Sequence, residues 1–315
     1  MNKPWTKDST PLFSVLIANY NNGQYLEECL QSVFDQTYTN WEIIIVDDGS
    51  TDIVSKKIYD KIKDNPKIWV FFNERNMGCG FAKRKCIAEA KGAICGFLDP
   101  DDTLEKTALE KATKQHKSFP SASLIYSTHF LCDEELNVIK TNDRVGEISA
   151  GESYLSSFNN DKVVSHFATF KTSLYRQTEG INQSLKRAVD QDLYYKLEEV
   201  GNLVYINEPL YFYRYYRVVG KEGLSSAGNE LKAQYWHLKV IDQARERRKK
   251  GLNIKTLPRK LSIFYWEQYY FSMANSSLKE NRPLRYFQFI LISLIFYPLN
   301  RTLLKIKLLL KPIVH

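Results

Sequence analysis

The sequence predicts an α/β fold with a mostly parallel central sheet, flanking helices and a helical extension at the C-terminus. In the first hundred residues, four apolar, β-branched runs alternate with stretches of helical periodicity. Nearly unbroken apolar strands joined by helices require a parallel sheet covered on both faces, with right-handed crossovers. From about residue 229 onward the sequence has the pattern of helix throughout.

The predicted strands follow one another at regular intervals. They are expected at Phe13–Ala18, Trp41–Val46, Ile68–Phe72, Ala93–Leu98 and Ser123–Thr128. Apolar residues at three- and four-residue steps indicate a helix after each of the first two strands: Leu26, Leu30 and Val33, then Val54, Ile58 and Ile62.

Beyond the fifth strand the alternation stops, and loop-rich sequence is expected to about residue 160. A mixed segment, Val163–Tyr216, contains a predicted helix at Asp190–Val200, which Gly201 ends.

Composition limits the class of protein. The chain of 315 residues is 43% hydrophobic, which suffices for one large domain or a domain with an appendage. Its 44 basic residues outnumber 36 acidic ones, and the excess gathers in the C-terminal third, where an anionic partner is expected. Five cysteines without metal-ligand spacing, and a polar N-terminus, favour reduced thiols in a cytosolic protein.

Polar turns follow the strands at the edge where an open parallel sheet binds ligands. The first strand is followed by Asn19–Gly23, the second by Asp47–Asp52 and the fourth by Asp99–Asp102. One acidic turn alone could serve only as a helix cap. Two carboxylate clusters side by side repel each other unless a cation or many hydrogen-bond donors compensate, and a bound metal is the simpler explanation.

The acidic run offers only hard oxygen ligands, from Asp99, Asp101 and Asp102. This ligand set favours Mn²⁺ or Mg²⁺ over Zn²⁺. Such a metal is suited to neutralising a diphosphate leaving group. No glycine-rich phosphate loop of the Walker or dinucleotide kind follows any strand, which argues against hydride transfer and P-loop phosphoryl transfer.

Over about Pro11–Leu104 the sequence resembles the family 2 glycosyltransferases. The resemblance rests on Ser14–Asn21, Tyr25-Leu26, Ser32-Val33, Gln36-Thr37, Val46–Asp52, Asn76–Gly78 and Phe97–Asp102. It implies the GT-A fold, a nucleotide-binding α/β domain, and inverting transfer of the kind used for bacterial surface polysaccharides.

The same resemblance implies a donor site. The turn of Asn19, Tyr20 and Asn21 would hold the pyrimidine of the donor, and Asp48 would accept a hydrogen bond from its N3–H. Asp99 and Asp101 correspond to the DxD carboxylates, which bind ribose and metal. Asp102 is a third candidate metal ligand.

Lys83-Arg84 stands where the family usually has Arg-Asn. One of these two cations is therefore expected to contact the diphosphate. The alternative is a solvated position on a helix face.

Inversion requires a base that deprotonates the acceptor hydroxyl. By the resemblance this base is Asp190, with Asp192 as the second candidate, and Val189 replaces the usual Glu. The alternative for Asp190 is an ordinary helix N-cap. His166 either faces the acceptor or packs as a structural histidine.

The C-terminal segment has an apolar stretch, Tyr286–Leu299, that is too short to span a bilayer. Basic residues border it: Arg282, Arg285, Arg301, Lys305, Lys307 and Lys311. This pattern is typical of a helix lying in the headgroups of an anionic membrane, here over residues 282–311. The alternative is a helix that packs on the catalytic domain or on a partner subunit.

The sequence thus predicts a glycosyltransferase domain at residues 1–225, with a donor half at about 11–128 and an acceptor half at about 129–225. Residues 226–315 form a helical, membrane-associated region. The predicted enzyme transfers a hexosyl or N-acetylhexosaminyl group from a UDP-sugar, or another pyrimidine nucleotide sugar, to a glycan or lipid-linked saccharide. Its expected location is the inner face of the cell membrane.

Two other functions remain as alternatives, a nucleotidyltransferase and a non-catalytic nucleotide-sugar-binding protein. Binding of nucleic acid is disfavoured, because acidic clusters occupy the sheet edge where a polyanion would dock.

Overall fold

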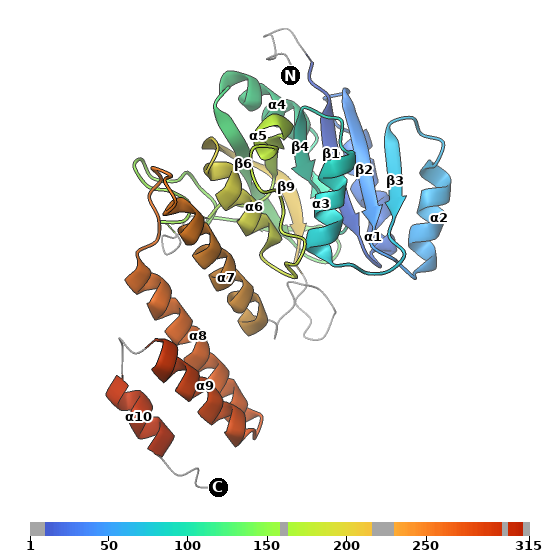
Figure 1. Ribbon diagram of the computed structural model, residues 1–315. Coiled ribbons are helices and arrows are strands. Elements are labelled where there is room, and N and C mark those ends of the chain that lie inside the picture. Colours follow the sequence, from blue (N-terminus) through green and yellow to red (C-terminus); the bar gives the residue numbers. More distant parts are fainter. Residues whose placement is uncertain (1–9, 158–162, 216–229, 298–301, 311–315) are drawn as a thin grey trace. The chain divides into compact units, whose positions relative to one another are not determined.

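The computed structural model describes residues 10–157, 163–215, 230–297 and 302–310 (Figure 1). These residues form two compact units. The first contains the described residues before 216 together with Leu252–Lys255, and the second contains the other described residues from Glu230 onward.

One mixed sheet lies at the centre of the first unit, with the strand order β3-β2-β1-β4-β8-β6-β9-β5 and with β7 paired to β6. The strands are β1 (Phe13–Asn19), β2 (Trp41–Asp47), β3 (Ile68–Phe72), β4 (Ile94–Phe97), β5 (Thr103–Leu104), β6 (Ala122–Cys132), β7 (Val138–Thr141), β8 (Ala168–Lys171) and β9 (Asn202–Arg214). Strands β1 to β4 are mutually parallel, as predicted, whereas β8 runs antiparallel to β4 and β6.

Helices connect the strands of this sheet. They are α1 (Gly23–Phe34), α2 (Ile53–Ile62), α3 (Cys79–Glu89), α4 (Ala108–Ser118), α5 (Thr172–Tyr175) and α6 (Val189–Glu198). Leu26, Leu30 and Val33 of α1 are buried against the sheet, which confirms the predicted helical face. In α2, Ile58 is buried and Ile62 packs against the same core, as predicted, whereas Val54 is exposed.

The strand order positions the site. The chain moves from β1 to β2 and β3 on one side of the sheet and then returns to place β4 on the other side of β1. Right-handed crossovers therefore put the helices that follow β1 and β3 on opposite faces, which opens a crevice at the ends of β1 and β4. The polar turns after β1, β2 and β4 share this edge.

The segment predicted to be loop contains a β-hairpin. Strand β6 extends to Cys132 and pairs with β7, whose four side chains are all exposed. An exposed edge strand buries no apolar face, so its sequence lacks the alternation by which strands are recognised. The prediction of loop was wrong here for that reason.

The second unit consists, in its described part, of helices α7 (Glu230–Arg248), α8 (Arg259–Lys279), α9 (Pro283–Phe296) and α10 (Thr302–Leu310). Its interior is rich in aromatic rings, and Trp266 contacts Tyr235, Tyr269, Tyr270 and Tyr297. The Trp266 indole N–H donates to Asp242 over 2.7 Å. No helix among the described residues is long and apolar enough to cross a membrane.

Lys305 does not border the apolar segment as a solvent-facing cation, contrary to the sequence pattern. It is fully buried, and its Nζ lies 2.9 Å from a carboxylate oxygen of Glu267. The same ammonium donates to the carbonyls of Ser293 and Tyr297. Lys305 therefore attaches α10 to α8 and α9 instead of to an external anion.

We expect Lys305→Met to cost about 3–5 kcal/mol of unfolding free energy in this helical unit, because Glu267 is left buried without a cation. The double variant Lys305→Met/Glu267→Met removes both charges and should recover most of that loss. Hydrogen exchange in the α8 and α10 peptides measures the difference. If these peptides are protected as strongly in the single variant as in the native protein, the ion pair contributes nothing to the stability of the unit.

Candidate active site

The turn after β1 is bonded to the turn after β2. The buried Asn19 amide nitrogen lies 2.8 Å from the Tyr59 hydroxyl and 3.2 Å from an Asp47 carboxylate oxygen. Asn21 adopts a φ of 54°, and its side-chain oxygen accepts from the amide of Thr51 at 2.8 Å. The two asparagine side chains thus shape the edge of the sheet, whereas the Tyr20 ring is 44% exposed above it.

Asp48 is buried at the end of β2 and already receives three hydrogen bonds. They come from the Asn73 side chain (2.7 Å) and the amides of Met77 (2.9 Å) and Gly78 (2.7 Å). A carboxylate offers about four acceptor positions, so one remains for a ligand N–H. Asp48 therefore fixes the loop between β3 and α3 and still has capacity for the predicted base contact.

Gly49 explains why this turn can approach that loop so closely. Its φ is +77°, and a Cβ atom there would lie 2.7 Å from the carbonyl carbon of Arg75. Any side chain would push the two loops apart.

The acidic turn after β4 is held by residues of β9. The Tyr211 hydroxyl donates to Asp102 at 2.7 Å and accepts from the Asp99 amide at 3.1 Å. The Arg214 amide donates to the other Asp102 oxygen, and its Nε donates to the carbonyl of Asp101, each at 2.7 Å. Both Asp102 oxygens are thus engaged by the protein, and the side chains of Asp99 and Asp101 are only partly buried.

Arg214 also bonds this turn to α1 and to the β6–β7 connection. Its Nη2 lies 2.7 Å from a carboxylate oxygen of Glu28, its guanidinium stacks over the Tyr25 ring at 4.4 Å, and its Nη1 donates to the carbonyl of Glu134. Sequence reasoning assigned no role to Arg214 or Tyr211. Their partners in the acidic turn lie more than 100 residues away in the sequence, so no local pattern pointed to them.

Charge accumulates in the acidic turn. Burial raises the pKa of the Asp102 carboxyl well above its usual range, and the neighbouring Asp101 and Asp99 add to this rise. Burial alone would also raise the pKa of Asp99, but the Lys83 ammonium and His166 lower it below its usual value. Asp101 and Asp99 thus place negative potential at Asp102, which a bound cation would lower.

Lys83 connects the acidic turn to α6. Its side chain is only 4% exposed, and its Nζ lies 2.8 Å from Asp190 and 3.3 Å from Asp99. Burial alone would lower the pKa of Lys83, but the two carboxylates raise it well above its usual value. The predicted base and a predicted donor ligand thus share one buried counter-ion.

Asp190 is not the N-cap of its helix. The cap is Ala188, in left-handed conformation, and no side chain bonds the first turn there. The capping alternative for Asp190 is therefore wrong, and its carboxylate, about one-third exposed, faces Lys83 instead.

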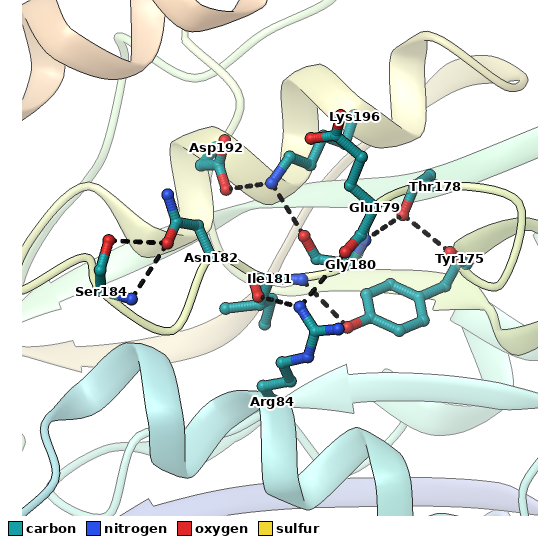
Figure 2. Close-up of polar contacts among 10 residues, drawn as sticks. All are labelled: Arg84, Tyr175, Thr178, Glu179, Gly180, Ile181, Asn182, Ser184, Asp192 and Lys196. Atoms are coloured by element: carbon teal, nitrogen blue, oxygen red, sulfur yellow. Dashed lines mark hydrogen bonds and ion pairs between the residues drawn. The ribbon is translucent and has the colours of Figure 1, made fainter.

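Arg84 and Asp192 have other partners, which Figure 2 shows. Arg84 Nη1 donates to the carbonyls of Ile181 (2.7 Å) and Glu179 (3.2 Å). Asp192 is fully buried and pairs with Lys196 at 2.7 Å. Of the two predicted diphosphate contacts the structure brings only Lys83 to the acidic turn, and of the two candidate bases only Asp190.

His166 stacks between aromatic rings close to the acidic turn. Its ring lies 5.0 Å from that of Tyr211 and 6.0 Å from that of Tyr213, at small interplanar angles. The His166 ring thus packs as a structural histidine would, and it is only partly buried.

The described residues contain no group of three His, Cys, Asp or Glu side chains arranged to hold a metal. The three predicted ligands Asp99, Asp101 and Asp102 do not converge, since Asp102 is turned toward β9 and Asp99 toward Lys83. Mn²⁺ and Mg²⁺ commonly take one or two carboxylates and complete their shell with phosphate oxygens and water. The partly exposed Asp101 and Asp99 fit that mode of binding.

Comparison with known proteins identifies the architecture. Chondroitin synthase of Escherichia coli is 32% identical over 242 residues, which cover 77% of this chain and 34% of that protein. The chain thus spans about a third of that relative's length.

Two solved structures share the fold. S. aureus TarS 1–349 in complex with UDP-GlcNAc superimposes with a TM-score of 0.56 at 17% identity, covering 87% of this chain and 89% of that one. Mannosyltransferase PcManGT from Pyrobaculum calidifontis, in complex with GDP-Man and Mn²⁺, gives 0.60 at 17% identity, covering 96% and 79%. These similarities confirm the predicted GT-A fold.

The family model described as "Glycosyl transferase family 2" matches residues 14–178, just over half of the chain. The match includes the turns after β1, β2 and β4, and it ends before α6. The chain therefore belongs to the family 2 glycosyltransferases.

Proposed function

We propose that the protein is an inverting glycosyltransferase that uses a pyrimidine nucleotide sugar, with UDP-sugars as the first candidates. The observation that supports this most is the pairing of Lys83 with both Asp99 and Asp190. Through this cation, Asp99 of the donor half (about residues 11–128) lies next to Asp190 of the acceptor half (about 129–225). A nucleotidyltransferase would not require a carboxylate in the position of Asp190.

The donor is proposed to lie across the turns after β1, β2 and β4. Tyr20 would cover the pyrimidine ring, and the remaining acceptor position of Asp48 would receive its N3–H. Two solved structures with the same fold contain UDP-GlcNAc and GDP-Man, which supports a nucleotide sugar as the donor.

Asp101 and Asp99 are the proposed protein ligands of a divalent metal, with Asp102 as a support that β9 holds in place. Mn²⁺ or Mg²⁺ bound there would neutralise charge on the leaving diphosphate. Lys83 is proposed to contact the same phosphates, because its ammonium lies 3.3 Å from a carboxylate oxygen of Asp99.

Asp190 is the proposed base, and it would remove the proton of an acceptor hydroxyl during attack on the anomeric carbon. To accept that proton, its carboxylate must give up part of the ion pair with Lys83. Movement of the ammonium toward donor phosphates would release the carboxylate. Donor binding and base activation are therefore connected through Lys83 in this proposal.

The acceptor is proposed to be a glycan or a lipid-linked saccharide used in the synthesis of a surface polysaccharide. The similarity to a chondroitin synthase supports this class of product. A non-catalytic nucleotide-sugar-binding protein is the alternative, because Val189 replaces the Glu usual in the family.

We further propose that residues 282–311 lie on an anionic membrane, at its inner face. Along α9, Leu284, Leu291 and Ile295 are exposed and recur at seven- and four-residue steps, so they share one face. The side chains of Arg282 and Arg285 are exposed at the start of this helix. An exposed apolar stripe beside cations suits a helix at the headgroup level. Arg301 and Lys311 lie outside the described residues.

The test of the enzymatic proposal is Asp190→Asn. A panel of nucleotide sugars with Mn²⁺, screened by thermal shift, first selects the donor. The substitution retains the size of the side chain but removes its proton affinity, so transfer should fall about 10²-fold or more. Donor affinity, measured by calorimetry, should not fall, because Lys83 keeps its contact with Asp99 and loses only the competing pair with Asp190.

Asp192→Asn is the matched variant on the same helix. It should cost about 3–5 kcal/mol of stability, because it leaves Lys196 buried without a counter-charge. Since Asp192 is not the proposed base, transfer by the folded variant should fall less than in Asp190→Asn. Transfer at nearly the native rate by Asp190→Asn would place the base elsewhere.

For the membrane proposal, Leu291→Glu/Ile295→Glu should abolish flotation with liposomes that contain phosphatidylglycerol. Two carboxylates on the stripe disfavour its burial among the lipids, and the anionic lipid surface repels them. Leu278→Glu, at an exposed position on α8, is the control and should still float. Failure of the native protein to float at low salt would contradict the proposal.

A further inference from the structure

Helix α3 carries two adjacent cations that are directed to different places. The Lys83 ammonium reaches Asp99 and Asp190, whereas the Arg84 guanidinium reaches the backbone of the loop that precedes α6. Successive residues project about 100° apart around a helix, so one helix can serve both. Helix α6 has a corresponding arrangement, with Asp190 facing Lys83 and Asp192 facing the interior of its own unit.

The loop between them is held at three consecutive carbonyl groups (Figure 2). Arg84 donates to those of Glu179 and Ile181, and the Lys196 ammonium donates to that of Gly180 at 2.8 Å. Two cations from two helices therefore fix the backbone of residues 179–181. Charge-assisted hydrogen bonds of this kind are about twice as strong as neutral ones.

Two further contacts restrict this loop. The Ile181 amide donates to the Tyr175 hydroxyl at 3.0 Å. The loop also lies directly against α3, because a Cβ atom on Gly80 would be 2.7 Å from the carbonyl oxygen of Asn182. The loop thus has little room to shift toward α3 without a clash.

The ion pair of Asp192 and Lys196 completes the arrangement. Both side chains are almost fully buried, at 1% and 4% exposure. A buried pair adds little stability compared with apolar side chains of the same volume. It does, however, direct the Lys196 ammonium at the Gly180 carbonyl, which an apolar residue could not do.

We propose that Arg84, Lys196 and Asp192 form a carbonyl clamp, which holds residues 179–181 and thereby positions Asp190 for proton abstraction. They are positioning residues that contact neither donor nor acceptor. This inference rests on the proposed role of Asp190 as the base. It also replaces the expectation that Arg84 touches the diphosphate.

The inference is tested with Arg84→Gln, which removes the charge and the fork of donors. A displacement of about 1 Å at a reacting group can lower a rate about 10²-fold. We therefore expect kcat for transfer from the panel-selected nucleotide sugar to fall about 10- to 100-fold. The donor KM and the affinity for UDP with Mn²⁺ should stay within about twofold, because the donor turns keep their contacts. Arg84→Lys should recover part of kcat.

Arg176→Gln, an exposed cation at the end of α5, is the control and should behave as the native enzyme. Hydrogen exchange in Arg84→Gln should rise in residues 179–190 and stay unchanged in the turns of Asp48 and Asp101.

Three results would overturn the clamp. The first is a kcat of Arg84→Gln that equals that of the native enzyme, measured below the unfolding temperature of the variant. The second is weaker UDP binding in that variant, which would make Arg84 a diphosphate contact. The third is unchanged exchange in residues 179–190. If the native protein transfers no sugar, or if Asp190→Asn is fully active, the proposed function fails instead, and the exchange experiment still reports on the clamp.

Discussion

The arrangement of the site depends on one buried ammonium group, that of Lys83. Taking a charge out of water costs several kcal/mol unless opposite charges compensate. Here compensation comes from two carboxylates on different parts of the chain, Asp99 after β4 and Asp190 on α6. Because an uncompensated buried charge is so costly, the acidic turn and α6 must approach Lys83 together. The ion pair thus provides an electrostatic reason why the acidic turn lies beside the proposed base, Asp190.

The surrounding contacts keep these three groups in place, and each turn at the sheet edge is bonded to another. Asp48 holds the loop before α3, Asn21 joins the first two polar turns, and Arg214 joins the acidic turn to α1. The polar residues at the strand ends therefore hold the turns together, in addition to their proposed roles in binding. This explains why a site that is rich in carboxylates can fold, since many of their oxygens are satisfied by the chain itself.

Much of the donor half could be predicted from the sequence, because its signals are local. Buried parallel strands are continuous apolar runs, and the polar turns follow them directly. The partners of Lys83 and Arg84 could not be predicted, since adjacent residues on a helix diverge and only tertiary packing decides what each one meets. Asp192 and Lys196 stand four residues apart on one helix, so their pairing is local, but the burial of that pair depends on tertiary packing. The burial of Asp102 and of Lys305 was missed for the same reason. Their charges suggested exposure, but distant residues, Tyr211 and Glu267, compensate them.

The central claim is that the acidic turn after β4 binds a nucleoside diphosphate together with a divalent metal. Titration calorimetry of UDP, with Mn²⁺ and then with excess chelator, tests it most directly on the native protein and on Asp101→Ala. The account predicts tight binding with Mn²⁺, loss of that binding in chelator, and the same loss in Asp101→Ala without a lower melting temperature. Undiminished affinity for UDP in chelator would contradict it.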